Sequence, residues 1–145
     1  MRALLDVNVL IALLDASHVH HCLASRWLGE HLDAGWASCP MTQNGCIRIM
    51  SAPAYPGDHL ASEVASRLAG ACRHPAHAFW PEDISVLDEG RVRWMALAGH
   101  RQITDAYLLA LAVRNGGRLV TLDRRISLDT VIGARTEHFL VLGKD

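Results

Sequence analysis

The chain has 145 residues, of which half are hydrophobic and a fifth charged, with a formal net charge of −1. This length suits one domain with a substantial core, and the composition excludes an intrinsically disordered chain. No apolar run approaches the roughly 20 residues needed to cross a bilayer. Residues 2–14 mimic a signal peptide, but Asp6 and Asn8 interrupt them and no small-residue cleavage site follows. We therefore expect a single domain over 1–145 that acts in the cytoplasm without membrane contact.

Charge is distributed unevenly along the chain. Residues 1–90 carry five Arg against ten acidic residues, whereas residues 91–135 carry eight Arg against three. Thirteen of the fourteen basic residues are Arg, which the codon composition of a genome explains in part. An Arg-rich second half beside an acidic first half also suits a phosphate backbone that meets a metal site.

The first half of the chain alternates between short apolar runs and amphipathic segments. Residues 2–6 predict a buried strand, and apolar positions at helical spacing predict a helix over 7–16. A second amphipathic helix is expected over 20–32 and a short strand over 35–38. A further helix is expected over 40–50, because proline is favoured in the first turn of a helix.

The middle of the chain is rich in residues that break regular structure. We expect a loop over 51–57, a helix that begins at 58 or 59 and ends near 72, and a second loop over 74–81. A strand is expected over 84–87 and a helix over 89–98.

The last third shows the clearest pattern. A helix is predicted over 103–115, closed by Asn115-Gly116-Gly117, and strands are predicted over 118–122 and 138–142. Strands that alternate with helices, with almost no hairpin signals, predict an α/β fold. We expect an α/β/α sandwich with a mostly parallel central sheet.

Three acidic residues are the main candidates for chemistry. Asp6 and Asp123 each end a predicted strand, and in α/β folds functional groups gather beyond the carboxyl ends of the strands. Asp105 lies in the first turn of a helix that is apolar on nearly every face, where a buried carboxylate is costly unless compensated. Taken singly, each acid also fits a capping or first-turn role. Together they favour a shared Mg²⁺ or Mn²⁺ site, which would activate a phosphoryl group and an attacking water.

Two other classes that begin with a strand ending in Asp are excluded by residue type. Phosphoaspartate enzymes of the dehalogenase type need a second acid where Asn8 stands, and they need a Lys. Response-regulator receivers need a Lys too, and none occurs before residue 144. The glycine-rich motifs that bind nucleotide phosphates are absent as well.

Four segments resemble the motifs of PIN-domain nucleases. The run Leu4–Leu13 resembles the opening motif of that family, and the segments 104–108 and 120–124 resemble its third and fourth motifs. The resemblance extends over nearly the whole chain, including residues 39–48 and 79–84. It is greatest to the VapC-type toxins of bacterial type II toxin–antitoxin pairs. Four motifs in order, at the right spacing, make the resemblance specific.

The resemblance implies a Mg²⁺- or Mn²⁺-dependent endoribonuclease that forms a homodimer. It also implies a cognate antitoxin protein whose C-terminal segment covers the active site, and contact with operator DNA only through that partner. Residue by residue, Asp6, Asp105 and Asp123 match the family's catalytic, metal-binding acids. Asn8 matches the polar residue after the first acid, and Thr121 matches the hydroxyl before the last.

Gln43 departs from the family pattern, which usually carries Glu after the threonine at this point. A glutamine keeps a carbonyl acceptor but lacks the charge. We expect it either to support the metal weakly or through water, or to be a solvated or capping residue of its helix. The departure keeps an alternative function open, in which a catalytically weak PIN-like module mainly binds its antitoxin.

Arg48, Arg124 and Arg125 are the arginines nearest the predicted active edge. They either hold RNA phosphates through forked hydrogen bonds or form salt bridges with the acidic half. Aromatic residues, at 6%, are too few for a base-stacking platform, so we expect RNA to be recognised by shape and phosphates. Three histidines between residues 18 and 21 fit no zinc-binding spacing and are expected to be solvated or capping.

Overall fold

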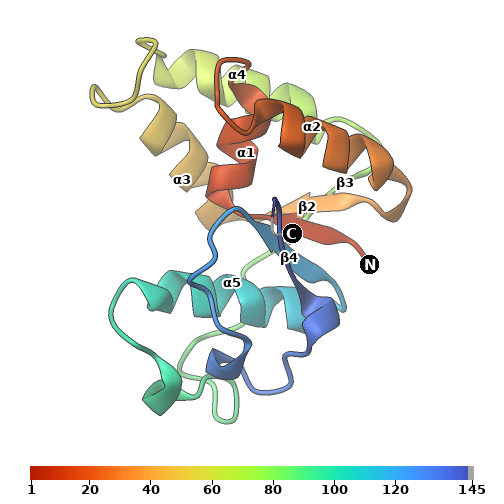
Figure 1. Cartoon of the computed structure of the whole chain (residues 1–145), viewed down its shortest axis with the longest axis vertical. Coiled ribbons are helices and arrows are strands. Elements are labelled where there is room, and N and C mark those ends of the chain that lie inside the picture. Colours follow the sequence, from red (N-terminus) through yellow and green to blue (C-terminus); the bar gives the residue numbers. More distant parts are fainter. Residues whose placement is uncertain (144–145) are drawn as a thin grey trace.

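A computed structural model describes residues 1–143, which form a five-stranded, wholly parallel sheet flanked by helices (Figure 1). The strands are β1 (Ala3–Leu5), β2 (Trp36–Ser38), β3 (His77–Phe79), β4 (Arg118–Thr121) and β5 (Phe139–Val141). The helices are α1 (Val7–Leu14), α2 (His21–Glu30), α3 (Pro40–Met50), α4 (Ala61–Cys72) and α5 (Gln102–Arg114). The predicted α/β/α sandwich with a parallel sheet is confirmed.

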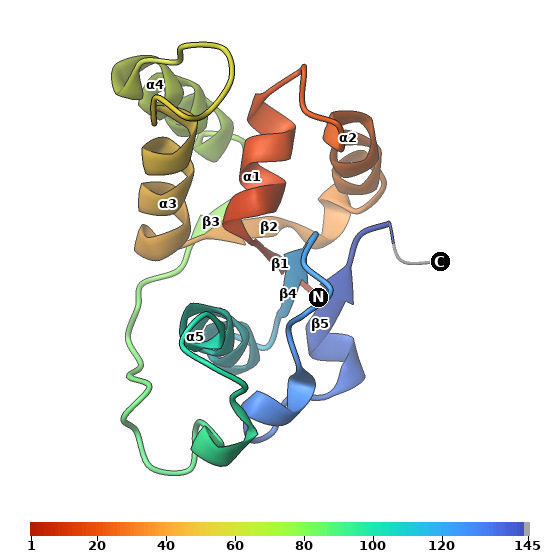
Figure 2. The same cartoon turned by 60° about the vertical axis from the view of Figure 1, so that its left-hand side comes forward.

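Helices cover both faces of the sheet. Figure 2 shows α1, α2, α3 and α4 on one face and α5 on the other. Alternate side chains of β1 follow this division, because Ala3 and Leu5 pack into the core beneath α1 whereas Leu4 packs against α5. A sheet buried on both faces needs apolar residues at successive positions, which is why its strands read as short continuous apolar runs.

Helix α5 is deeply buried, since every residue from Ala106 to Ala112 is shielded from solvent. It ends as predicted, with Gly116 in the left-handed region at φ 65°. Gly117 follows where a side chain has no room, because a Cβ would lie 2.5 Å from the Arg2 carbonyl oxygen. Within residues 1–143, none of the helices has the length and apolarity needed to span a membrane.

The strand order is β3-β2-β1-β4-β5, so the order reverses at the β1–β4 pair. The register places Leu5 opposite Val120, and the residues that follow these two strands therefore emerge at the same height. In open α/β sheets, ligands bind in the crevice outside the carboxyl ends of strands at such a reversal. The fold thus directs attention to Asp6 and the residues after β4.

The expected strand over 84–87 is wrong, and the third strand lies at 77–79, inside the expected loop. Residues 77–79 pair with β2, which leaves them at the edge of the sheet. Ile84 and Val86 do pack against the core on the α5 side, which explains their alternating pattern. Their backbone nevertheless forms no strand within the described part of the chain.

The expected helix over 89–98 is wrong as well. This segment contains only a 3₁₀ turn at Trp94–Ala96. Val92 instead forms an antiparallel bridge with Val131, and the Arg93 amide donates to the Thr130 carbonyl at 2.9 Å. Pairing with a segment distant in the sequence therefore overrides the local helical spacing.

Candidate active site

Asp6 lies where β1 ends and α1 begins, and its side chain is buried, with 7% of the residue exposed. One carboxylate oxygen caps α1 by accepting the Val7 amide at 2.7 Å, so the capping role is real. The other oxygen accepts the Thr121 hydroxyl at 2.7 Å. Burial raises the pKa of Asp6 despite these two hydrogen bonds, and the nearby Asp123 charge raises it further.

Thr121, the last residue of β4, uses its hydroxyl fully. The hydroxyl donates to Asp6 and accepts from the Asn8 side-chain amide at 3.2 Å and from the Asp123 backbone amide at 3.0 Å. A hydroxyl has one donor and two lone pairs, so no capacity is left over. The Asn8 carbonyl oxygen in turn accepts the Leu122 amide at 3.1 Å. This network fixes the start of α1 to the end of β4.

Asp105 reaches the same place from the other face of the sheet, in the first turn of α5. Together with Asp6 and Asp123 it lines a cavity of about 400 Å³, which we call the acid cleft. Partial burial, followed by the charges of Asp6 and Asp123, raises the pKa of Asp105 to about 6, and the Arg125 charge opposes this only in part. The metal-free cleft therefore holds mutually repelling carboxylates.

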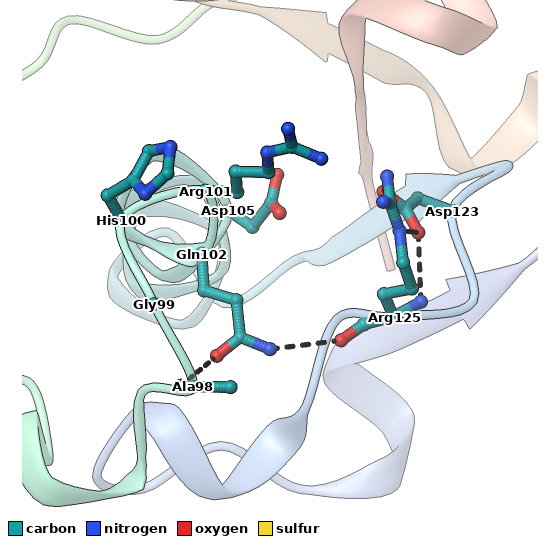
Figure 3. A pocket seen from close by; sticks show the side chains of 8 residues that line it. All are labelled: Ala98, Gly99, His100, Arg101, Gln102, Asp105, Asp123 and Arg125. Carbon is teal, nitrogen blue, oxygen red and sulfur yellow. Dashed lines mark hydrogen bonds and ion pairs between the residues drawn. The ribbon is translucent and has the colours of Figure 1, made fainter.

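The negative charge of Asp123 is compensated by the guanidinium of Arg125. The guanidinium forks onto both carboxylate oxygens at 3.0 and 2.9 Å, and the Arg125 amide donates to one of them at 2.9 Å (Figure 3). These hydrogen bonds lower the pKa of Asp123. Asp123 is thus the first residue of a turn and does not cap an α-helix.

A second cavity, of about 510 Å³, adjoins the acid cleft. Asp105 and Asp123 line both cavities. The wall of the second cavity is formed by residues 98–102 and by Arg125 (Figure 3). The acids therefore lie between two hollows, and an extended ligand that crosses them has room on either side.

The chemistry of the acid cleft fits a hydrated divalent ion. Within residues 1–143, no three His, Cys, Asp or Glu side chains form a ready-made metal cage. Mg²⁺ does not require one, because it keeps several waters and binds through one or two carboxylates. Asp6 and Asp105 offer hard oxygen ligands, and a cation between them would relieve their repulsion. Asp123 would be a third ligand only after release from Arg125.

Three residues expected near the site lie elsewhere. The Gln43 side-chain amide donates to the Ser38 hydroxyl at 2.9 Å, and Gln43 lines a separate cavity between α3 and α4. Arg48 is exposed on α3 and lines neither hollow beside the acids. Arg124 donates to the Gly143 carbonyl at 2.9 Å. The expected contribution of these three to the acid cleft is therefore not supported by their positions.

Other residues line the two hollows without having been expected there. Arg101 and His100 border the larger cavity, and Ile49 and Tyr55 border the acid cleft. The position of Arg101 near the acids could have been predicted from its spacing. It stands four residues before Asp105, so it lies above the same face of α5, one turn before that acid. The loop that carries Tyr55 has no periodicity from which its position follows.

The Thr121 network predicts a contrast between two substitutions. Thr121→Val keeps the shape but removes the donor to Asp6, so it should lower the free energy of unfolding by about 2 kcal/mol. Thr121→Ser keeps the hydroxyl and should cost only the buried methyl group, about 1 kcal/mol or less. Urea denaturation of the metal-free variants measures both. Equal losses would contradict the network.

The Asp105 pKa predicts a pH-dependent effect in the metal-free protein. Because folding raises this pKa from its ordinary value to about 6, the folded state binds more protons than the unfolded state between these values. Stability from this group is therefore present at low pH and lost as pH rises through about 6. Asp105→Asn should be more stable than wild type at pH 7, on the order of 1 kcal/mol because water screens the half-buried charge.

The two proteins should converge near pH 4. Urea denaturation in the presence of a chelator at both pH values checks this. A stability difference that does not depend on pH would show that Asp105 does not titrate in the way described.

Comparisons with known proteins identify the family. The family model of the PIN domain matches residues 3–129. Ribonuclease VapC44 of Mycobacterium tuberculosis is 46% identical over 142 residues, which cover 98% of this chain and 100% of that protein. Ribonuclease VapC39 of the same organism is 41% identical over 128 residues, covering 88% of this chain and 92% of that protein.

A solved structure shares the fold. VapC20 of Mycobacterium tuberculosis, described as a toxin that cleaves the sarcin–ricin loop, matches with a TM-score of 0.59 over 80% of this chain and 85% of that chain. Its sequence identity is 14%, so this likeness concerns the fold alone. The family model and the two nearly full-length relatives carry the assignment: the chain belongs to the PIN-domain family and, within it, to the VapC ribonucleases.

Proposed function

We propose that this chain is a Mg²⁺- or Mn²⁺-dependent endoribonuclease that acts as the toxin of a toxin–antitoxin pair in the cytoplasm. The observation that carries the proposal is the acid cleft, where carboxylates from three distant segments line one cavity. Its relatives are ribonucleases by name, which supports RNA as the substrate. The two adjoining hollows give a strand room on both sides of the acids.

Each residue of the cleft has a distinct proposed role. Asp6 and Asp105 would hold the ion, and Asp123 would complete the acidic set. The Thr121 hydroxyl and the Val7 amide orient the two Asp6 oxygens by donating to them, and Asn8 positions Thr121 by donating to its hydroxyl. When bound, a divalent ion supplies Lewis-acid activation of a phosphoryl oxygen and lowers the pKa of an attacking water.

Loss of a ligand should abolish both cleavage and metal binding. Asp6→Asn and Asp105→Asn should each reduce RNA cleavage about 100-fold or more, and Mn²⁺ should raise the melting temperature of wild type but not those of the two variants. Gln43→Glu is the matched control, because it adds a carboxylate outside the acid cleft. Its Mn²⁺ affinity in calorimetric titration should equal that of wild type.

Full cleavage by Asp6→Asn in the presence of chelator would overturn the metal-dependent mechanism. Tenfold tighter Mn²⁺ binding by Gln43→Glu would instead show that Gln43 turns into the cleft and supports the metal, as the family pattern suggests.

The acid cleft also fits an antitoxin segment that carries a cation. Ile11, Ile49 and Tyr55 line the cleft beside the acids, so an apolar segment bearing Arg or Lys meets complementary surfaces there. The homodimer that the family resemblance implies belongs to the same proposal, and light scattering of the purified chain tests it.

An Arg or Lys side chain of the antitoxin and the metal ion should compete for the carboxylates of the acid cleft. Raising the Mn²⁺ concentration should weaken the affinity of wild type for its proposed antitoxin. The affinity of Asp105→Asn should change much less, because that variant holds the metal poorly. Calorimetric titration at several Mn²⁺ concentrations measures both, and an identical metal dependence would count against a shared site.

The alternative is a catalytically weak module that mainly binds its antitoxin. This alternative arose from the missing carboxylate at Gln43. The contact of the Gln43 amide with the Ser38 hydroxyl and its place in the lining of another cavity speak against a need for a carboxylate there. Asp6, Asp105 and Asp123, the three acids that match the family's catalytic set, all line the cleft, which favours the enzyme. Cleavage of RNA by the purified chain with Mn²⁺ separates the two functions.

A further inference from the structure

We propose that Arg101 is an RNA-phosphate contact, and that the strand leaving the acid cleft runs over the loop formed by residues 98–101, with His100 beside it. This inference rests on the proposed ribonuclease function and adds to it a contact that lies outside the four motif segments. It concerns the larger hollow, where neither Arg48 nor Arg124 is found.

Arg101 shares its cavity with the acids. It immediately precedes α5, and Asp105 lies one turn further along the same face of that helix. Figure 3 shows the side chains of Arg101 and Asp105 extending from α5 toward the segment that carries Asp123 and Arg125. A phosphodiester held at the acids therefore places a neighbouring phosphate within this hollow.

The charge of Arg101 has no partner within the described chain. No carboxylate in residues 1–143 lies within 4.0 Å of its guanidinium, whereas Arg91, Arg114, Arg125 and Arg135 each have one. A cation at the N-terminal end of a helix also opposes the helix dipole, which disfavours it by some tenths of a kcal/mol. Eight other arginines in residues 1–143 also lack a carboxylate within 4.0 Å, so it is the place of Arg101 in the cavity beside Asp105 that singles it out, and its forked donor set suits a phosphate.

Gln102 holds this loop in place. Its side-chain oxygen accepts the Ala98 amide at 2.7 Å, which closes the loop, and its side-chain amide donates to the Arg125 carbonyl at 3.2 Å (Figure 3). The second bond ties the loop to the segment that begins with Asp123. The backbone that carries Arg101 is therefore held near the acids before RNA arrives, which lowers the entropic cost of binding.

Arg125 differs from Arg101 in this respect. Its guanidinium is engaged by Asp123, so it is not available until that carboxylate finds another cation. Arg101 is available at once. We therefore assign the first phosphate contact on this side of the acids to Arg101.

The test measures RNA binding apart from cleavage. In the Asp105→Asn background with chelator, a fluorescein-labelled RNA hairpin with a single-stranded loop is titrated at several salt concentrations. Arg101→Gln should weaken binding about fivefold at 0.1 M salt and reduce the slope of log affinity against log salt by about 0.7, as expected for one lost phosphate contact. Arg101→Lys should recover most of the slope, because it keeps the charge.

Arg114→Gln is the matched control, with the same charge change at the other end of the same helix. Its RNA affinity should stay within about twofold of the reference, since it lies roughly 20 Å away. The melting temperature of Arg101→Gln should equal or exceed that of the reference, which excludes misfolding as the cause. With Asp105 restored, Arg101→Gln should raise KM for RNA more than it lowers kcat.

Equal affinities for Arg101→Gln and Arg114→Gln would overturn the contact while leaving the ribonuclease intact. So would a loss confined to kcat, which would place Arg101 in the chemical step. Failure of the proposed ribonuclease function would give a different result. The wild-type chain with Mn²⁺ would cleave no RNA, and the Asp105→Asn reference would bind no RNA. The Arg101 contact would then be overturned together with that function.

Discussion

The Asp6 carboxylate is buried at the end of the central strand, and two donors, the Val7 amide and the Thr121 hydroxyl, compensate its charge. The Val7 amide reaches Asp6 only if α1 starts immediately after β1, and the Thr121 hydroxyl reaches it only if β4 lies beside β1 in the observed register. The position of this one carboxylate thus depends on the helix start, the strand pairing and the crossover that brings β4 into place. The same residue serves as helix cap and as proposed metal ligand, so the two interpretations of its sequence position are not alternatives.

The sequence was a good guide wherever a segment is buried on both sides. Strand β1 is apolar throughout, β4 is apolar at Leu119 and Val120, and α5 is apolar from Ala106 to Val113, so these patterns have one interpretation. Asp6 and Asp123 were found because they follow such strands. The segment 84–98 misled for the opposite reason: its apolar residues have strand-like and helix-like spacing, but they pack on one side only or bridge to Val131, and the backbone forms neither a strand nor an α-helix.

Side-chain direction was the other limit of prediction. Gln43 stands at a motif position, yet its amide reaches the Ser38 hydroxyl on β2, a contact that spacing along α3 does not reveal. Arg125 was correctly placed near the active edge, but its engagement with Asp123 depends on a turn of two residues. Two of the three cleft acids, Asp105 and Asp123, belong to the Arg-rich segment 91–135 and lie beside Arg101 and Arg125, whereas Asp6 comes from the acidic first part of the chain. The cleft is consequently acidic at its centre and cationic along one rim.

The hydrogen bond between Asp6 and Thr121 joins residues 115 positions apart. Contacts of such long range form late, because a large loop must close before they contribute. During synthesis Asp6 is made among the first residues, whereas its donor and the third acid come only after residue 120. A nascent chain therefore carries no acid cleft until β4 has been made and has paired with β1. Translation itself therefore sets the earliest moment at which the complete site can exist.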